Sequence, residues 1–137
     1  MKANELEIMK LANNYGLFET PIKEYPRKMS QFDAYNKDCI VEIKHRDSFW
    51  DDALIEFGKY SFNKEFAKLN KLNSLYLKRM ANRLVIFDLL YLESINYDFK
   101  WEWKDMPKNT EFGNNEMIPK FVGYINVKDA CENIEIV

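Results

Sequence analysis

An acidic residue and a Glu-x-Lys motif lie close together near the middle of the first half of this chain. Asp33 is followed by Glu42 and Lys44, which lie in a stretch that alternates apolar and polar residues as a β-strand does. Alternate residues of a strand point to opposite faces, so Glu42 and Lys44 share one face. The other face carries apolar residues that can face a core, Cys39, Val41 and Ile43. Carboxylates bind hard divalent cations, and a nearby ammonium can meet a nucleophile or a phosphate, so the pattern indicates metal-assisted phosphodiester chemistry.

A β-hairpin would bring Asp33 to the same place. The predicted strands and the loop between them are Gln31–Tyr35, Asp38–Arg46 and Asn36-Lys37. Asn tolerates the positive φ that such a two-residue turn needs. In this register Asp33 pairs with Ile40, on the face of Glu42 and diagonal to it. A three-residue loop would instead pair Asp33 with Val41 and send it to the core face.

Glu42 and Lys44 also allow a simpler interpretation. Many half-exposed strands alternate charged and aliphatic residues, and an exposed ion pair contributes little free energy. The three residues alone therefore leave a solvated strand face open as an alternative to a catalytic site.

Length and composition predict a single folded domain over residues 1–137, with 47% hydrophobic and 15% aromatic residues. Cys39 and Cys131 lack metal-type spacing, which favours a reduced, cytoplasmic setting. No signal peptide is evident, and the longest apolar run, Leu84–Leu92, is too short to span a membrane and contains Asp88. We therefore expect a soluble, intracellular protein without a membrane partner.

The net charge of −2 does not by itself indicate a nucleic-acid-binding protein. Between Lys59 and Arg83, however, there are seven basic residues and one acid. A local positive field of this kind can contact phosphates, although a solvated lysine-rich helix face has the same composition. The candidate nucleic-acid contacts are Lys59, Lys64, Lys78 and Arg79.

Hydrophobic periodicity predicts helices and strands that would position these residues. A first helix is expected from about Ala3 to Tyr15, ending at Gly16, and a long second helix from about Phe49 to Leu69, capped by Ser48. The expected later strands are Leu75–Met80, Arg83–Leu90, Phe99–Trp103 and Phe121–Val127, with a loop at 107–116. This order predicts an α/β fold with a mixed central β-sheet flanked by helices.

At this point the chain resembles the PD-(D/E)xK nuclease superfamily. The resemblance spans roughly Lys2 to Leu90 and rests on Asp33, on Glu42-Ile43-Lys44 and on the following helix with Lys59-Tyr60. It implies a restriction-endonuclease-like core and Mg²⁺-dependent hydrolysis of DNA, with Mn²⁺ as a substitute metal. The small size and the Asn/Lys/Tyr/Ile-rich composition are similar to those of phage or mobile-element nucleases, which would place the protein in the cytoplasm of a host cell.

The resemblance implies a role for each matching residue. Asp33 and Glu42 would be the motif acids that bind the metal, and Ile43 would offer its backbone carbonyl. Lys44 would position or deprotonate the attacking water. Glu5 is the candidate for a further helical ligand, with Glu7 as the other choice. Lys59 matches a helical position that often faces the site.

The chain also departs from the family pattern, and other functions stay open. Phe32 stands where the motif has proline, and the segment from Trp101 onward has no counterpart. The main alternative is a catalytically silent domain of the same fold that binds nucleic acid or protein. A third interpretation is an unrelated α/β interaction protein with a surface Glu42–Lys44 pair. A homodimer is left open.

Three further residues of chemical interest are expected to be structural. His45, the only histidine, lies on the opposite face from Lys44 and has no evident catalytic partner. Trp101 and Trp103 alternate with charged residues and could stack on bases. Aromatic pairs on a strand more often belong to a core, and we predict that role for both tryptophans.

Overall fold

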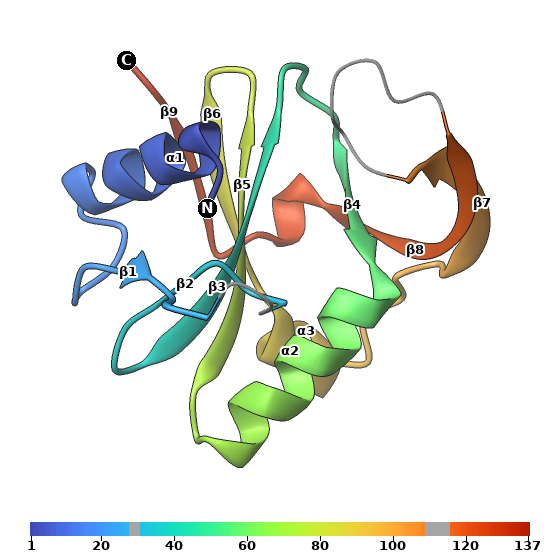
Figure 1. Cartoon of the computed structure of the whole chain (residues 1–137), viewed down its shortest axis with the longest axis horizontal. Coiled ribbons are helices and arrows are strands. Elements are labelled where there is room, and N and C mark those ends of the chain that lie inside the picture. Colours follow the sequence, from blue (N-terminus) through green and yellow to red (C-terminus); the bar gives the residue numbers. More distant parts are fainter. Residues whose placement is uncertain (28–30, 109–115) are drawn as a thin grey trace.

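The computed structural model describes residues 1–27, 31–108 and 116–137. Its centre is a mixed six-stranded sheet with the order β1-β2-β3-β5-β6-β9 (Figure 1). The strands are β1 (Lys23–Glu24), β2 (Ala34–Tyr35), β3 (Cys39–Arg46), β5 (Asn73–Met80), β6 (Arg83–Asp88) and β9 (Glu132–Glu135). β3 and β5 are parallel, whereas the other neighbours are antiparallel. The expected α/β class with a mixed sheet and flanking helices is thus confirmed.

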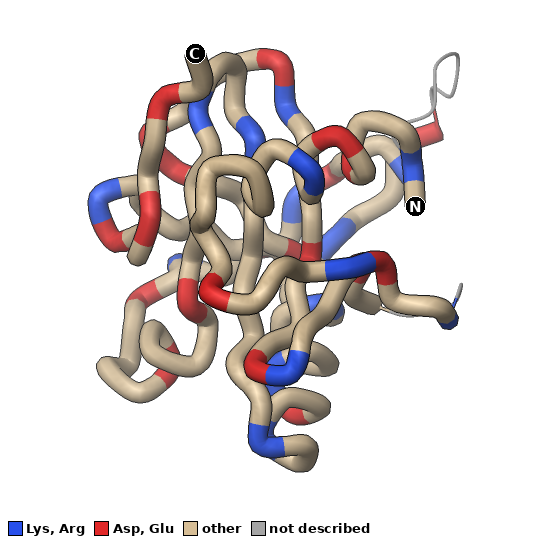
Figure 2. The backbone as a smooth tube through the Cα atoms, turned by 90° about the vertical axis from the view of Figure 1, so that its left-hand side faces the viewer, with Lys and Arg blue, Asp and Glu red and all other residues tan. Residues whose placement is uncertain are grey.

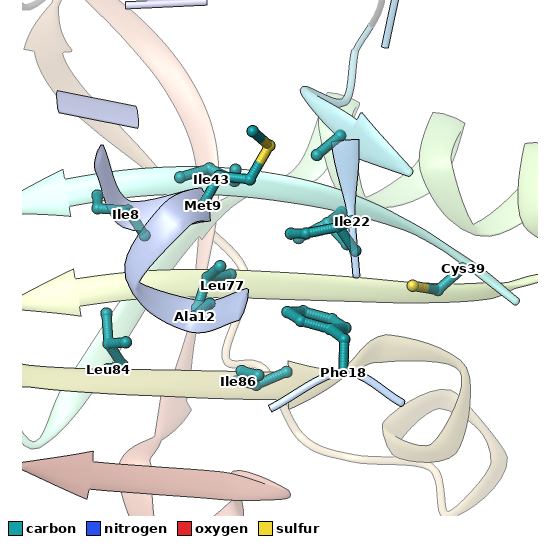
Figure 3. Close-up of a cluster of buried hydrophobic side chains, with 12 residues drawn as sticks. Ile8, Met9, Ala12, Phe18, Ile22, Cys39, Ile43, Leu77, Leu84 and Ile86 are labelled. Carbon is teal, nitrogen blue, oxygen red and sulfur yellow. The ribbon is translucent and has the colours of Figure 1, made fainter. Parts of the chain in front are cut away.

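Helix α1 (Ala3–Asn14) covers one face of this sheet, to the left in Figure 1. Its apolar residues Ile8, Met9 and Ala12 pack on Val41 and Ile43 of β3 and on the neighbouring strands (Figure 3). The helix ends as predicted, because Gly16 takes a left-handed conformation with φ of 68°. The face of β3 that carries Cys39, Val41 and Ile43 is therefore the core face, as its alternation indicated.

The opposite face is covered by two helices and a second sheet. Helix α2 (Phe57–Leu69) and helix α3 (Leu89–Ser94) lie beside an antiparallel sheet of order β4-β8-β7. Its strands are β4 (Asp52–Glu56), β8 (Met117–Asn126) and β7 (Glu102–Pro107), and a short 3-10 turn, η1, follows at Val127–Asp129. Strand β4 and helix α2 form the crossover between the parallel strands β3 and β5 (Figure 1).

The long helix predicted from Phe49 to Leu69 is wrong in its first part. Residues Asp52–Glu56 form β4, so Ser48 does not cap a helix and Asp52 is not in a first helical turn. Ala53 and Ile55 are buried while their neighbours are more exposed, which is the period of a strand. The strand forms because β8, far away in the sequence, pairs with it from Asp52↔Asn126 to Glu56↔Val122.

The β2–β3 hairpin has the predicted face parity but not the predicted register. Tyr35 pairs with Ile40 and Ala34 with Val41, a shift of two residues from the expected pairing. The turn moves because the Asn36 side chain accepts hydrogen bonds from the N–H groups of Asp38 and Cys39, at 2.7 and 2.9 Å. Strand β2 is also shorter than Gln31–Tyr35, and Asp33 lies just before it.

The later elements agree with the prediction in part. The β5–β6 hairpin turns at Ala81-Asn82 as expected, but β6 ends at Asp88, and Leu89 begins α3. The Asp88 side chain accepts the N–H of Tyr91 and caps that helix. Strand β7 begins at Glu102, so the strand expected over Phe99–Trp103 is mostly displaced. The loop expected at 107–116 lies largely outside the described residues.

In Figure 2 the Lys and Arg positions and the Asp and Glu positions are interspersed along the backbone. Among the described residues, no helix is long and apolar enough to cross a membrane. Both cysteines are free thiols, Cys39 buried and Cys131 exposed.

Candidate active site

Asp33 is held against the middle of β3 by backbone hydrogen bonds. Its N–H donates to the Val41 carbonyl at 2.9 Å, and its carboxylate oxygen Oδ2 accepts the Ile43 N–H at 2.7 Å. The N–H and C=O of one strand residue point to the same side, so the Ile43 carbonyl also points toward Asp33. Burial raises the pKa of Asp33, the Ile43 N–H lowers it, and the charge of Glu5 raises it again.

Glu42 is a buried carboxylate, and only one of its two oxygens has a partner in the described part of the chain. Its side chain faces α2, and the residue is 4% exposed. Oε1 lies 3.7 Å from Lys59 Nζ, whereas Oε2 is buried without a hydrogen-bond partner among the described residues. Burial raises the pKa of Glu42 to about 7, although the positive charges of Lys59 and Lys44 act in the opposite direction. The interpretation of Glu42 as half of an exposed surface ion pair is therefore wrong.

Lys44 lies on the same face as Glu42 and lines the same cavity. This cavity, of about 240 Å³, is bounded by β3, β4, β5, β7 and β8, and its wall also includes Arg46, Glu56 and Lys120. Lys44 is half-buried, so the solvated strand face expected for it is only partly present. Burial lowers its pKa, and the charges of Lys59 and Arg46 lower it further.

The two N-terminal glutamates differ in their surroundings. Glu5 lies close enough to Asp33 for its charge to raise the pKa of that carboxyl group. Glu7 instead forms an ion pair with Arg79, whose Nη1 lies 3.5 Å away. Of the two candidates for a helical ligand, Glu5 is thus the one near the acidic site.

The four predicted nucleic-acid contacts do not form one surface. Lys59 and Lys78 reach the Glu42 face, and Lys78 is the direct neighbour of Lys44 across the parallel β3–β5 pair. Lys64 binds Glu93 of α3 at 2.6 Å. Arg79 follows Lys78 in the strand and therefore points to the α1 face, where it pairs with Glu7.

Several residues near the site were not anticipated from the sequence. Glu56 forms an ion pair with Lys120 of β8, with 3.1 Å between Oε1 and Nζ, and lies 4.0 Å from Lys59. Burial acts to raise the pKa of Glu56, but the hydrogen bond and charge of Lys120 outweigh it and hold the pKa below its usual value. Glu56 was assigned to the interior of a helix. The run Ala53-Leu54-Ile55 is apolar without alternation, so the local sequence carried no period-2 signal for this strand.

The donor set fits a hard divalent cation. In the part of the chain that the structure describes, no group of three or more His, Cys, Asp or Glu is arranged to hold a metal. Mg²⁺, however, commonly takes only one or two carboxylates and keeps several waters. Asp33, Glu42 and the Ile43 carbonyl supply such a set, and the orphaned Oε2 of Glu42 is an acceptor that a cation would satisfy.

His45, Trp101 and Trp103 were each predicted to have a structural role, and the outcomes differ. His45 Nε2 lies 3.0 Å from Asp47, away from the acidic site. Trp101 packs with Phe99 and Tyr60 in the core beneath the small sheet, as predicted. Trp103 is 71% exposed, so its assignment to the core is wrong.

Comparison with known proteins found no matching family model, no similar curated protein and no similar solved structure.

The opposite pKa shifts of two neighbouring glutamates predict opposite effects on stability. The folded-state pKa of Glu42 is raised to about 7, so its ionisation destabilises the fold as the pH rises from about 4.5 toward 7. Glu42→Gln should therefore stabilise the metal-free protein at pH 7.5 by on the order of 1–2 kcal/mol. The pKa of Glu56 is lowered, so Glu56→Gln should destabilise it at the same pH.

Urea unfolding in EDTA at pH 7.5 and pH 5 measures both effects. The increase in the free energy of unfolding caused by Glu42→Gln should be smaller at pH 5, because the wild-type carboxyl group is then largely protonated. A Glu42→Gln protein that is less stable than wild type at pH 7.5 would contradict the raised pKa.

Proposed function

We propose that this protein is a metal-dependent nuclease that hydrolyses phosphodiester bonds in nucleic acid, most simply DNA, with a PD-(D/E)xK type of active site. The observation that carries the proposal is the unsatisfied Oε2 of the buried Glu42, which shares a cavity with Lys44. Asp33 lines a different cavity, but it lies close enough to Glu42 for its charge to raise the pKa of that carboxyl group. A buried carboxylate oxygen without a partner is costly unless a ligand or a proton satisfies it.

Asp33, Glu42 and the Ile43 carbonyl would hold Mg²⁺, or Mn²⁺ in its place, with Glu5 as a further acid nearby. The bound metal would supply an activated water and neutralise charge on the phosphate. Lys44 would place its ammonium against the same phosphate, where it stabilises the charge that develops during attack. Its lowered pKa makes Lys44 a candidate to accept a proton from the attacking water.

A neighbouring basic cavity supports binding of a phosphate backbone. This cavity of about 520 Å³ is lined by Arg46, Lys78, Lys104 and Trp50, together with Asp51 and Asp52, and shares Arg46 with the Glu42 cavity. Lys78 is 4% exposed, and no acidic group among the described residues forms an ion pair with it. Burial lowers the pKa of Lys78 to about 7, and the charges of Arg46 and Lys44 lower it further. An incoming phosphate would favour its charged form.

The topology agrees with a restriction-endonuclease-like core. The proposed core consists of α1, the β1–β2–β3 meander, the crossover through α2 and the β5–β6 hairpin. In this arrangement Asp33 lies just before β2, beside the part of β3 that carries Glu42 and Lys44, and a cavity lined by Glu42 and Lys44 offers room for a ligand.

The alternative function is a silent domain of the same fold that binds nucleic acid without cutting it. One observation favours this alternative, because Lys59 Nζ lies 3.7 Å from Glu42 Oε1 and already offsets part of the charge that would attract a metal. In a nuclease, Lys59 would turn toward the phosphate when the metal binds.

The deciding experiment is cleavage of plasmid and single-stranded DNA with Mg²⁺ or Mn²⁺. The proposal predicts metal-dependent products that disappear with EDTA and with Glu42→Gln. Retention of the products in Glu42→Gln would show a contaminating activity. DNA binding without cleavage in either metal would favour the silent domain.

A further inference from the structure

An aromatic groove adjoins the candidate active site on its α2 side. It has a volume of about 510 Å³, and its lining includes Phe57, Lys59, Phe62, Trp103, Lys120 and Phe121. Glu56 and Lys120 line this groove and also the cavity of Glu42 and Lys44. A ligand in the aromatic groove would therefore lie next to the cavity that contains Glu42 and Lys44.

The groove presents aromatic surfaces that the core does not use. Trp103 is 71% exposed and rests on Phe121, with 5.1 Å between ring centroids. Phe62 is 50% exposed and is supported from below by Phe66 in a stacked arrangement at 6.2 Å. Phe57 makes an edge contact with Phe121 at 5.4 Å. The rings are thus held in place by other rings and leave large surfaces open to the groove.

The charges at the groove suit a nucleotide better than an apolar peptide. Lys59 and Lys120 lie beside the rings, and both also contact the acids that border the catalytic cavity. A nucleotide combines a flat base, which stacks on aromatic rings, with a phosphate, which binds ammonium groups. The bases of a duplex already stack on one another and cannot offer their faces to Trp103.

We propose that this groove binds an unpaired nucleobase beside the scissile phosphate, so that the preferred substrate is single-stranded DNA. The inference deepens the proposed nuclease function and rests on it for the position of the scissile phosphate. Trp103 and Phe62 would stack on the base, while Lys120 would contact the adjoining phosphate.

The test measures binding separately from cleavage. Fluorescence anisotropy in EDTA gives the Kd of a labelled single-stranded oligonucleotide and of the same sequence as a duplex. Wild type should bind the single strand more tightly. Trp103→Ala should weaken single-strand binding about 5- to 150-fold, because one stacked base contributes roughly 1–3 kcal/mol. Trp103→Phe should recover part of the loss, because it keeps an aromatic face.

Tyr91→Ala is the matched control, since Tyr91 is an exposed aromatic residue of α3 that does not line the groove. It should bind single strands as wild type does. Circular dichroism confirms folding of each variant.

Each result separates the two proposals. Loss of single-strand binding in Trp103→Ala supports the groove even if wild type never cleaves DNA, which would refute the nuclease alone. If Trp103→Ala binds and cleaves single strands as wild type does, the proposed role of the groove is wrong, but the nuclease proposal stands. Dissociation of a wild-type dimer by Trp103→Ala, without a change in DNA affinity, identifies the groove as a self-association surface and also overturns the inference.

Discussion

Lys44→Ala is expected to slow DNA cleavage by about 100- to 1000-fold while metal binding is retained. A preorganised charge that meets the developing negative charge of a transition state is commonly worth about 2.7–4 kcal/mol. Lys44 shares its cavity with Glu42 but does not belong to the proposed ligand set. Single-turnover cleavage with saturating Mg²⁺ isolates the chemical step, and Mn²⁺ titration tests the metal site.

The stability of this variant should change little. Lys44 is half-buried among the positive charges of Lys59 and Arg46, so its removal relieves repulsion while it loses some packing. Lys10→Ala provides the control, because Lys10 is an exposed lysine on α1, the helix that covers the other face of the sheet. Wild-type cleavage by Lys44→Ala would remove the centre of the nuclease proposal, and an equal loss in Lys10→Ala would point to a general charge effect.

Asp33→Asn is expected to abolish the metal site, with the loss of both Mn²⁺ binding and cleavage. Asparagine can still accept the Ile43 N–H at the position of Oδ2, so the backbone hydrogen bond is preserved while the charge is removed. Asp33→Ala would remove both and is less informative. Isothermal titration with Mn²⁺ measures the site directly.

Metal binding should also depend on pH with a defined sign. Burial raises the pKa of Glu42 to about 7, so this carboxyl group is protonated in most of the molecules at pH 6. Metal binding must displace that proton. The affinity should rise as the pH increases from 6 to 8, and the number of protons released should fall over the same interval. Asp38→Ala, which removes an exposed carboxylate from the β2–β3 turn, should bind Mn²⁺ as wild type does. Equal Mn²⁺ binding by Asp33→Asn and wild type would refute the shared site.

Short-range patterns in the sequence correctly identified strand β3, which carries Glu42 and Lys44, whereas Asp33 lies outside the strand predicted for it. The alternation from Cys39 to Lys44 determined which face of β3 is apolar, and α1 packs on that face. Gly16 ended the first helix, and Ala81-Asn82 turned the β5–β6 hairpin as predicted. These features depend on residues a few positions apart, where side-chain period and backbone preference act directly.

The depth of the site was decided by tertiary packing. Glu42 was expected on a solvated face, but α2 and the β4-β8-β7 sheet cover it and raise its pKa to about 7. The sequence around Glu42 contains no information about this cover, because it comes from residues that pack on β3 from distant parts of the chain. The unsatisfied Oε2 and the neutralising Lys59 are consequences of the same packing.

Local periodicity was enough to predict helix α1, strand β3 and the core face of β3, and the residue types of β3 indicated metal and phosphate chemistry. The strand Asp52–Glu56, in contrast, depends on pairing with β8, about 70 residues away in the chain, as the pair Asp52↔Asn126 shows. The tertiary structure likewise moved the hairpin register through the Asn36 side chain, brought Glu56 beside the site and left Trp103 exposed. Strand pairing and burial are contacts between distant segments, so local periodicity cannot specify them.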